Sequence, residues 1–300
     1  THYNALYNNM AVNEMFLDSA RKRNSVVSIS KMLGYTPRSA TCSQATVNIV
    51  VSGGTSSPSN LTLPSYSAFN TSINGKSYSF YTQGTITVNR VANTYTFDNV
   101  KIIEGTPLSY QYTVSNGTRY IIPNLGVDLD TLKVRVQENA SSNVYETWAP
   151  AGEIVDIEND TNAYWTKEID DGLYEVYFGD GIIGKLLSDG NIVNISYVAT
   201  DGTLAAGANN FILMDSISGY TTLQIFPVVP ASNGGDKEGI DSIKFQAPKA
   251  FSAQGRAVSK NDYITAIQQN TLGYSFDAVN VWGGEENTPV VYGQVFVCLK

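Results

Sequence analysis

The chain has 300 residues, of which 19 are basic and 27 acidic, and its formal net charge is −8. This length is enough for two or three domains with substantial cores. The acidic balance argues against a nucleic-acid-binding protein, which needs a basic surface to displace counterions. The sequence contains no run of about 18 apolar residues, so we expect no membrane span.

Cysteine and histidine are too scarce for the common catalytic and metal sites. The two cysteines, Cys42 and Cys298, lie far apart in sequence and indicate neither a disulfide framework nor a zinc site. The one histidine, His2, leaves almost no material for a Ser-His-Asp triad or a histidine-based metal site. We therefore predict that the protein is not an enzyme and binds no cofactor or metal ion.

Residues 1–38 are predicted to be a helical segment for bundle packing, with two helices. Apolar side chains spaced three and four residues apart indicate the first helix. Asn24 or Ser25 would cap the second helix, and Gly34 stands at the position that ends it. The basic run at residues 21–23 is expected to be a solvated helix end.

The apolar surface of the first helix is broad for one face of a lone helix. One explanation is packing on the second helix and the next domain. The other is packing in a bundle with other chains, since a wide exposed apolar surface marks interaction. The candidate protein-interface residues are Tyr3, Leu6, Tyr7, Met10 and Phe16.

An antiparallel β module is predicted for residues 39–127, because the apolar period changes to two from about residue 40. Val47, Ile49 and Val51 show this alternation, and glycine-containing turn signals separate the later strands. The predicted strands after the first are residues 61–63, 78–82, 85–89, 95–104, 110–114 and 119–122.

A second β module is predicted for residues 128–231. Leu132, Val134 and Val136 alternate with polar side chains, and another strand begins at Tyr164. The acidic residues between positions 156 and 171 could suggest calcium, but they do not form an EF-hand loop, so we expect solvated turns.

Residues 232–300 are predicted to be an α+β domain that is incomplete at its C-terminus. Gly234 and Gly235 lie in a hinge-like loop, a short helix follows and ends at Pro248, and Ser259 caps a further helix. The last two predicted strands are residues 278–282 and 290–299.

Together these elements predict a multidomain α+β fold with N-terminal helices, two mainly antiparallel β modules and a C-terminal α+β domain. The chain begins with a helix at Thr1 and stops on a strand. We therefore expect it to be a segment of a longer polypeptide.

A glycine-rich stretch after the strand at Leu173 resembles a nucleotide site at first. Gly179, Gly181 and Gly184 satisfy G-x-G-x-x-G, and Lys185 completes most of a P-loop. Either motif holds a phosphate only when a helix follows it, and here a turn signal and alternating chain follow. We predict a β meander in which the glycines serve tight turns, with a nucleotide site as the minor alternative.

The order of four segments along the chain identifies a protein family more specifically than any single motif does. They are the helical block of residues 3–37, the stretch 178–185 (Phe-Gly-Asp-Gly-Ile-Ile-Gly-Lys), residues 234–248, and residues 256–263. In this order the sequence resembles the baseplate wedge proteins that form the inner ring of contractile-tailed phage baseplates, of the T-even-like type, within the baseplate J-like group. Residues 52–127 contain none of these motifs, and they are included in the resemblance mainly because they lie between the matching segments.

The resemblance implies a non-enzymatic virion part, a late protein of the tail baseplate that is assembled in the host cytoplasm. It implies that two copies pair as a homodimer within each wedge, and that the N-terminal helices pack with another wedge protein in a hetero-oligomer. Neighbouring wedges, the tail hub and sheath-initiating proteins are further implied partners. Rearrangement of the ring would relay host contact to sheath contraction.

The motif residues are expected to be structural. Arg256 is expected to clamp Asp262 or a backbone carbonyl, with a contact between subunits as the alternative. Two departures from the family pattern are Gly255 before Arg256 and Ser259 in place of threonine. The structural-motif residues are Gly179, Gly181, Gly184, Gly234, Gly235, Arg256, Asp262 and Tyr263.

A different class of function stays open beside this one. The β modules are rich in tyrosine, tryptophan and asparagine, which would also suit a glycan-binding or depolymerising tail module. That function needs an exposed aromatic platform or a cleft with two carboxylates.

Overall fold

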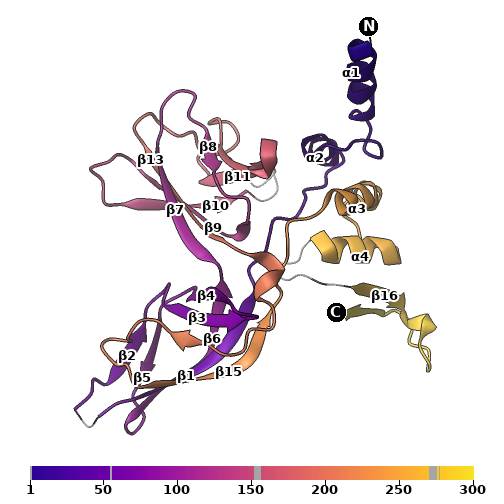
Figure 1. Cartoon of the computed structure of the whole chain (residues 1–300). Helices are drawn as coiled ribbons and strands as arrows, with labels where there is room; N and C mark the ends of the chain where they lie inside the picture. Colours follow the sequence, from indigo (N-terminus) through magenta and orange to yellow (C-terminus); the bar gives the residue numbers. More distant parts are fainter. Residues whose placement is uncertain (1, 55, 152–156, 270–275, 277) are drawn as a thin grey trace.

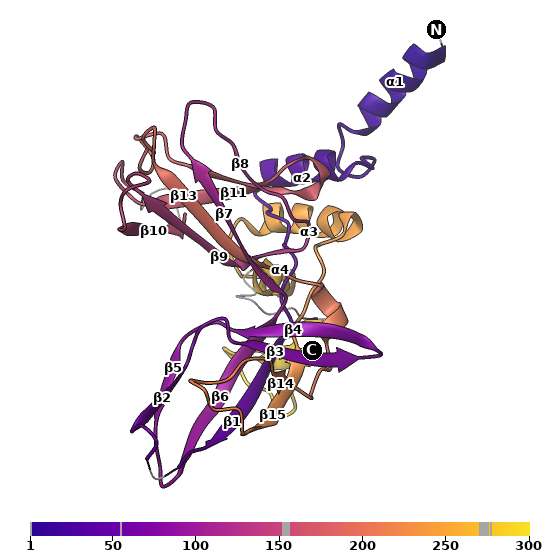
Figure 2. The same ribbon diagram turned by 60° about the vertical axis from the view of Figure 1, so that its left-hand side comes forward.

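The computed structural model describes residues 2–54, 56–151, 157–269, 276 and 278–300. It confirms the multidomain α+β fold: two β lobes lie on one side and the helices on the other (Figure 1). Helix α1 extends away from all of them in both views (Figure 2).

The first lobe is built on an antiparallel six-stranded sheet in the order β14-β3-β4-β6-β1-β15, with a separate β2–β5 ribbon. In β1 every second residue is buried, as the alternation predicts, and Val47, Ile49 and Val51 lie in the core of this lobe. The strands are β1 (Gln44–Ser52), β2 (Asn60–Leu63), β3 (Ala68–Ile73), β4 (Lys76–Thr82), β5 (Ile86–Asn89), β6 (Thr94–Glu104), β14 (Ile212–Leu213) and β15 (Leu223–Ser232).

The second lobe is a seven-stranded sheet in the order β7-β13-β9-β10-β11-β12-β8. Its neighbours are antiparallel except for β10 and β11, which are parallel. The strands are β7 (Thr106–Thr113), β8 (Tyr120–Ile122), β9 (Val127–Gln137), β10 (Tyr145–Pro150), β11 (Ala163–Glu168), β12 (Tyr174–Phe178) and β13 (Ile192–Ala199).

The helical side contains a small core in which Val26 and Val27 pack against Ile243 and Ala247. The following α4 contacts α3 and the β16–β17 ribbon. The elements are α1 (His2–Asn13), α2 (Arg23–Met32), α3 (Ile240–Ala253), α4 (Lys260–Gln269), β16 (Val279–Gly283) and β17 (Val295–Leu299).

Sheet membership differs from the predicted boundary between residues 127 and 128. The strands β7 and β8, placed in the first module by the prediction, belong to the seven-stranded sheet, while β14 and β15 complete the six-stranded one. The second lobe is therefore inserted between β6 and β14. Turn signals space strands along the chain, but they do not tell which distant strands pair, since pairing depends on contacts across the fold.

Three local predictions need correction. The helix expected to end at Pro248 continues to Ala253, because buried Ile243 and Ala247 hold the turns before the proline and buried Ala253 holds its last turn. Strands β3, β10, β14 and β15 were not predicted. The last strand begins at Val295 rather than at residue 290. The predicted end of α4 at residues 272–273 lies outside the described residues.

Candidate interface site

Helix α1 presents its apolar side chains to solvent. Tyr3, Leu6, Tyr7 and Met10, at the helical spacing of one face, are between 46 % and 76 % exposed. Phe16, in the turn after α1, is 62 % exposed. Figure 2 shows this helix projecting from the rest of the chain. Of the two predicted explanations, packing within the chain is not what the described residues show.

The chain becomes anchored directly after this helix. Leu17 packs against the helical core, in which Ala20 is fully buried. Lys244 of α3 donates to the Asp18 carbonyl at 3.0 Å. The Glu14 carboxylate accepts from the Arg21 N–H at 2.9 Å, and hydrogen bonds from Ser25 and this N–H hold the pKa of Glu14 below its usual range.

The predicted start of helix α2 is wrong, whereas its predicted end is confirmed. It begins at Arg23 after Lys22, so neither Asn24 nor Ser25 is its N-cap, because Ser25 bonds Glu14 instead. Its end is as predicted: Gly34 has φ +77°, its N–H bonds the Lys31 carbonyl at 3.0 Å, and the next N–H bonds the Ser30 carbonyl at 2.9 Å. This is a Schellman motif.

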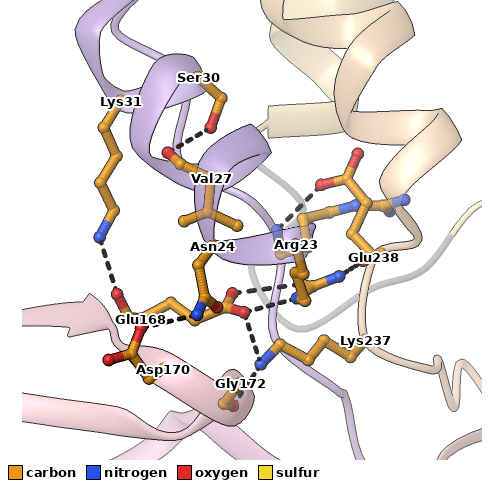
Figure 3. Close-up of polar contacts among 11 residues, drawn as sticks. Arg23, Asn24, Val27, Ser30, Lys31, Glu168, Asp170, Gly172, Lys237 and Glu238 are labelled. Atoms are coloured by element: carbon orange, nitrogen blue, oxygen red, sulfur yellow. Dashed lines mark hydrogen bonds and ion pairs between the residues drawn. The ribbon is translucent and has the colours of Figure 1, made fainter. Parts of the chain in front are cut away.

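A polar network joins α2 to both the seven-stranded sheet and the segment before α3 (Figure 3). Arg23 Nε donates to Glu168 Oε1 at 2.5 Å and its Nη2 donates to Oε2 at 3.2 Å. Arg23 Nη1 also donates to the Glu238 carbonyl at 2.5 Å. The prediction of a solvated helix end is wrong for Arg23, whose side chain is 21 % exposed.

Lys237 brings a second cation to the same carboxylate. Its Nζ lies 3.1 Å from Glu168 Oε1, donates to the Gly172 carbonyl at 2.5 Å, and lies 4.5 Å from the centre of the Tyr174 ring. Burial lowers the pKa of Lys237, and the nearby Glu168 opposes that shift. Because the Glu168 side chain is 4 % exposed, it stands between two cations with little water.

Glu238 forms the other half of the anchor. Its Oε1 accepts from the Tyr35 hydroxyl at 2.7 Å and from Ser242 at 2.7 Å, and its Oε2 accepts from the Arg38 N–H at 3.0 Å. Burial, together with the facing Glu238 carboxylate, raises the pKa of the Tyr35 hydroxyl. Residues from positions 23, 35, 168 and 238 are thus brought into one cluster.

The glycines 179, 181 and 184 form a tight loop whose hydrogen bonds stay within the protein. The Gly181 N–H bonds the Gly184 carbonyl at 3.0 Å, and the Gly184 N–H bonds the Glu158 carbonyl at 3.0 Å. A Cβ on Gly179 would lie 2.3 Å from the Gly184 carbonyl. Lys185 pairs with Glu146 at 2.7 Å. These donors are therefore not directed at a phosphate.

The hinge expected at Gly234 and Gly235 is a close-packed crossing. A Cβ on Gly234 would lie 2.1 Å from Ser43 Oγ and 2.4 Å from the Gly202 carbonyl. The Gly235 N–H and carbonyl bond the carbonyl and N–H of Thr41 at 3.0 and 2.9 Å. Such packing fixes the segment, which does not favour a hinge at this point.

The C-terminal motif residues surround the start of α4. Ser259 caps this helix as predicted: its N–H bonds Asp262 Oδ2 at 2.8 Å, and its Oγ accepts the Asp262 N–H at 3.3 Å. The guanidinium of the exposed Arg256 donates to Gln254 Oε1 at 3.0 Å, and the Arg256 backbone N–H donates to the Ala253 carbonyl at 2.9 Å. The Tyr263 N–H bonds the Ser259 carbonyl.

Sequence reasoning missed Glu168, Lys237 and the role of Arg23, because nothing in a single sequence links positions so far apart. Lys237 and Glu238 do lie in the third segment of the resemblance. Among the described residues, no three or more His, Cys, Asp and Glu side chains are grouped to hold a metal ion. No helix of the described chain is long and apolar enough to cross a membrane.

Comparison with known proteins addresses the resemblance directly. The chain is 26 % identical over 298 residues to the baseplate wedge protein gp6 of Enterobacteria phage T4, a match that covers 89 % of this chain and 44 % of that protein. The chain thus spans less than half the length of this curated relative. No protein-family model matches it.

A chain in a solved structure, the six-fold symmetrised baseplate of the anti-feeding prophage, is similar to this one. The match covers 96 % of this chain and 55 % of the baseplate chain. Its identity is 13 % and its TM-score 0.33, too low to support an argument. The similarity to the T4 protein confirms the resemblance to baseplate wedge proteins that the four segments indicated.

Proposed function

We propose that this chain is a structural, non-catalytic part of the baseplate wedge in a contractile phage tail. The observation that carries the proposal is the pair of N-terminal helices, in which α2 is anchored by a buried polar network while α1 projects with its apolar face exposed. An exposed apolar helix face of this kind marks a contact with another surface, and a helix that is already formed offers an assembling protein a preformed contact surface.

The finer parts of the proposal concern partners. We place the chain in the inner ring around the tail hub, paired with a second copy of itself. Another wedge protein packs on the N-terminal helices, at Tyr3, Leu6, Tyr7, Met10 and Phe16. Neighbouring wedges and sheath-initiating proteins complete its contacts. Rearrangement of the ring relays host contact to sheath contraction, and the protein acts in the virion after assembly in the host cytoplasm.

The test replaces two residues of the exposed face, Leu6→Asp and Tyr7→Asp, in the full-length protein. We expect the variant to fold with an unchanged melting temperature and to be missing from assembled tail particles. The matched control, Asn4→Asp with Asn8→Asp, adds the same charge to the other side of α1 and should be incorporated normally. Equal incorporation of both variants would contradict the helix contact, and electron microscopy of the particle would locate the chain.

A cavity between the two lobes supports the alternative, a glycan-binding tail module. It has a volume of about 220 Å³ and is lined by Tyr66, Tyr81 and Tyr197 together with Asp130 and Lys133. Aromatic rings beside polar groups are a common basis of sugar binding. A glycan array tests this function, and the absence of binding by the folded chain would dismiss it.

A further inference from the structure

The loop that resembled a nucleotide site ends in an exposed apolar tip. Ile182 is 77 % exposed, Leu186 61 % and Ile183 41 %. We name these three residues the loop tip. Large aliphatic side chains at the end of a short loop are unfavourable in water, and clustered exposure of this kind marks a protein contact.

The loop tip is held in one conformation before any partner arrives. Asp180 Oδ1 accepts the N–H groups of Ile182 and Ile183 at 2.9 and 3.0 Å. These hydrogen bonds lower the pKa of Asp180. The Lys185 N–H bonds the Thr161 carbonyl at 2.9 Å.

Contacts with the sheet complete this rigid arrangement. A Cβ on Gly184 would lie 3.1 Å from the Trp165 ring, so the loop lies directly against β11. A contact surface that is already ordered loses little conformational entropy when it binds, which favours affinity.

The charges around the loop tip indicate what kind of surface it fits. The carboxylates of Glu158, Asp160 and Asp180 are exposed on the loop and on the turn bonded to it. Lys185, the cation of the loop, is already paired with Glu146 at 2.7 Å. The rim is therefore acidic around an apolar centre.

We propose that the loop tip inserts into an apolar pocket with a basic rim on a different protein of the assembly. A second copy of this chain fits poorly, because two tips meeting across a two-fold axis would bring the same carboxylates together. This inference rests on the proposed baseplate function and adds a second contact surface, on the seven-stranded lobe, to the helix α1.

The experiment measures incorporation of the full-length protein into assembled tail particles. Ile182→Asp places a charge in the apolar centre and should reduce incorporation about 30-fold, the loss typical of a central contact residue. The matched control is Ile212→Asp, because Ile212 is 65 % exposed on the other lobe. It should be incorporated like the wild type, and both variants should keep the wild-type melting temperature.

Charge reversal tests the chemistry of the partner. Glu158→Lys with Asp160→Lys should reduce incorporation about tenfold, since like charges would then face each other across the contact. Asp98→Lys, at an exposed position of β6, is the control for a change of charge elsewhere. If the reversed variant is incorporated like the wild type, the basic rim is refuted.

Photo-crosslinking from position 182 identifies the partner. A crosslink to a peptide of another protein that contains lysine or arginine beside apolar residues supports the proposal, and a crosslink to a second copy overturns it. If Ile182→Asp is incorporated normally while the wild type is present in particles, only this inference fails. If the wild type itself is absent from the particles, the proposed function fails first.

Discussion

Helices α1 and α2 come from one short block of sequence, yet the structure holds them in opposite ways. Helix α2 buries Val26 and Val27 and is tied by Arg23 to two distant segments. Helix α1 leaves Leu6 and Tyr7 more than half exposed. The difference shows that an apolar helical pattern predicts packing against another surface. Only the fold tells whether that surface belongs to the same chain.

The largest effect should come from breaking the α2 anchor. Glu168→Ala would leave Arg23 and Lys237 partly buried without their carboxylate and should lower the free energy of unfolding by about 4 kcal/mol. Urea denaturation measures it. Glu146→Ala removes the carboxylate of an exposed ion pair and should cost less than about 1 kcal/mol. Equal losses in the two variants would show that the buried network does not anchor α2.

The apolar half of the same anchor should give the next effect. Ile243 is fully buried between α3 and α2, so Ile243→Ala should cost about 3 kcal/mol through lost burial and a cavity. Val258→Ala, at a position 82 % exposed, is the comparison. A loss below about 1 kcal/mol in Ile243→Ala would mean that α2 is not packed as described.

A smaller effect should come from the end of α2. Gly34 has φ +77° and open space around its Cα, so Gly34→Ala should cost about 1 kcal/mol from backbone strain alone. Gly84→Ala is matched, because that residue also has open space around it but its φ lies outside the left-handed region. Equal stability of the two variants in thermal denaturation would argue against the Schellman motif.

The smallest effect should come from α1. Leu6→Ala should change the stability of the isolated chain by less than about 0.5 kcal/mol, because the side chain loses few contacts. The amides of α1 should exchange with deuterium much faster than those of α2. A loss of 2 kcal/mol, or slow exchange in α1, would show that the helix is packed within the chain and would remove the main support for the interface.

Several elements were predictable because their signals are local. The alternation in β1 and β13, the left-handed Gly34 and the Ser259 cap depend on residues within a few positions of one another. The course of α3 through Pro248 was not predictable, because packing on α2 outweighed a strong local helix breaker. The candidate contact surface on α1 was named from its spacing, and its exposure came from the structure.

The sequence by itself determined the type of most elements, the absence of a helix after Lys185 and the resemblance to baseplate wedge proteins. Only the tertiary structure decided that β14 and β15 complete the first sheet, that Gly234 lies in a packed crossing, and that Glu168 joins Arg23 to Lys237. The reason is physical: periodicity and turn chemistry act over a few residues, whereas sheet pairing and buried charge networks join segments that can lie more than a hundred positions apart.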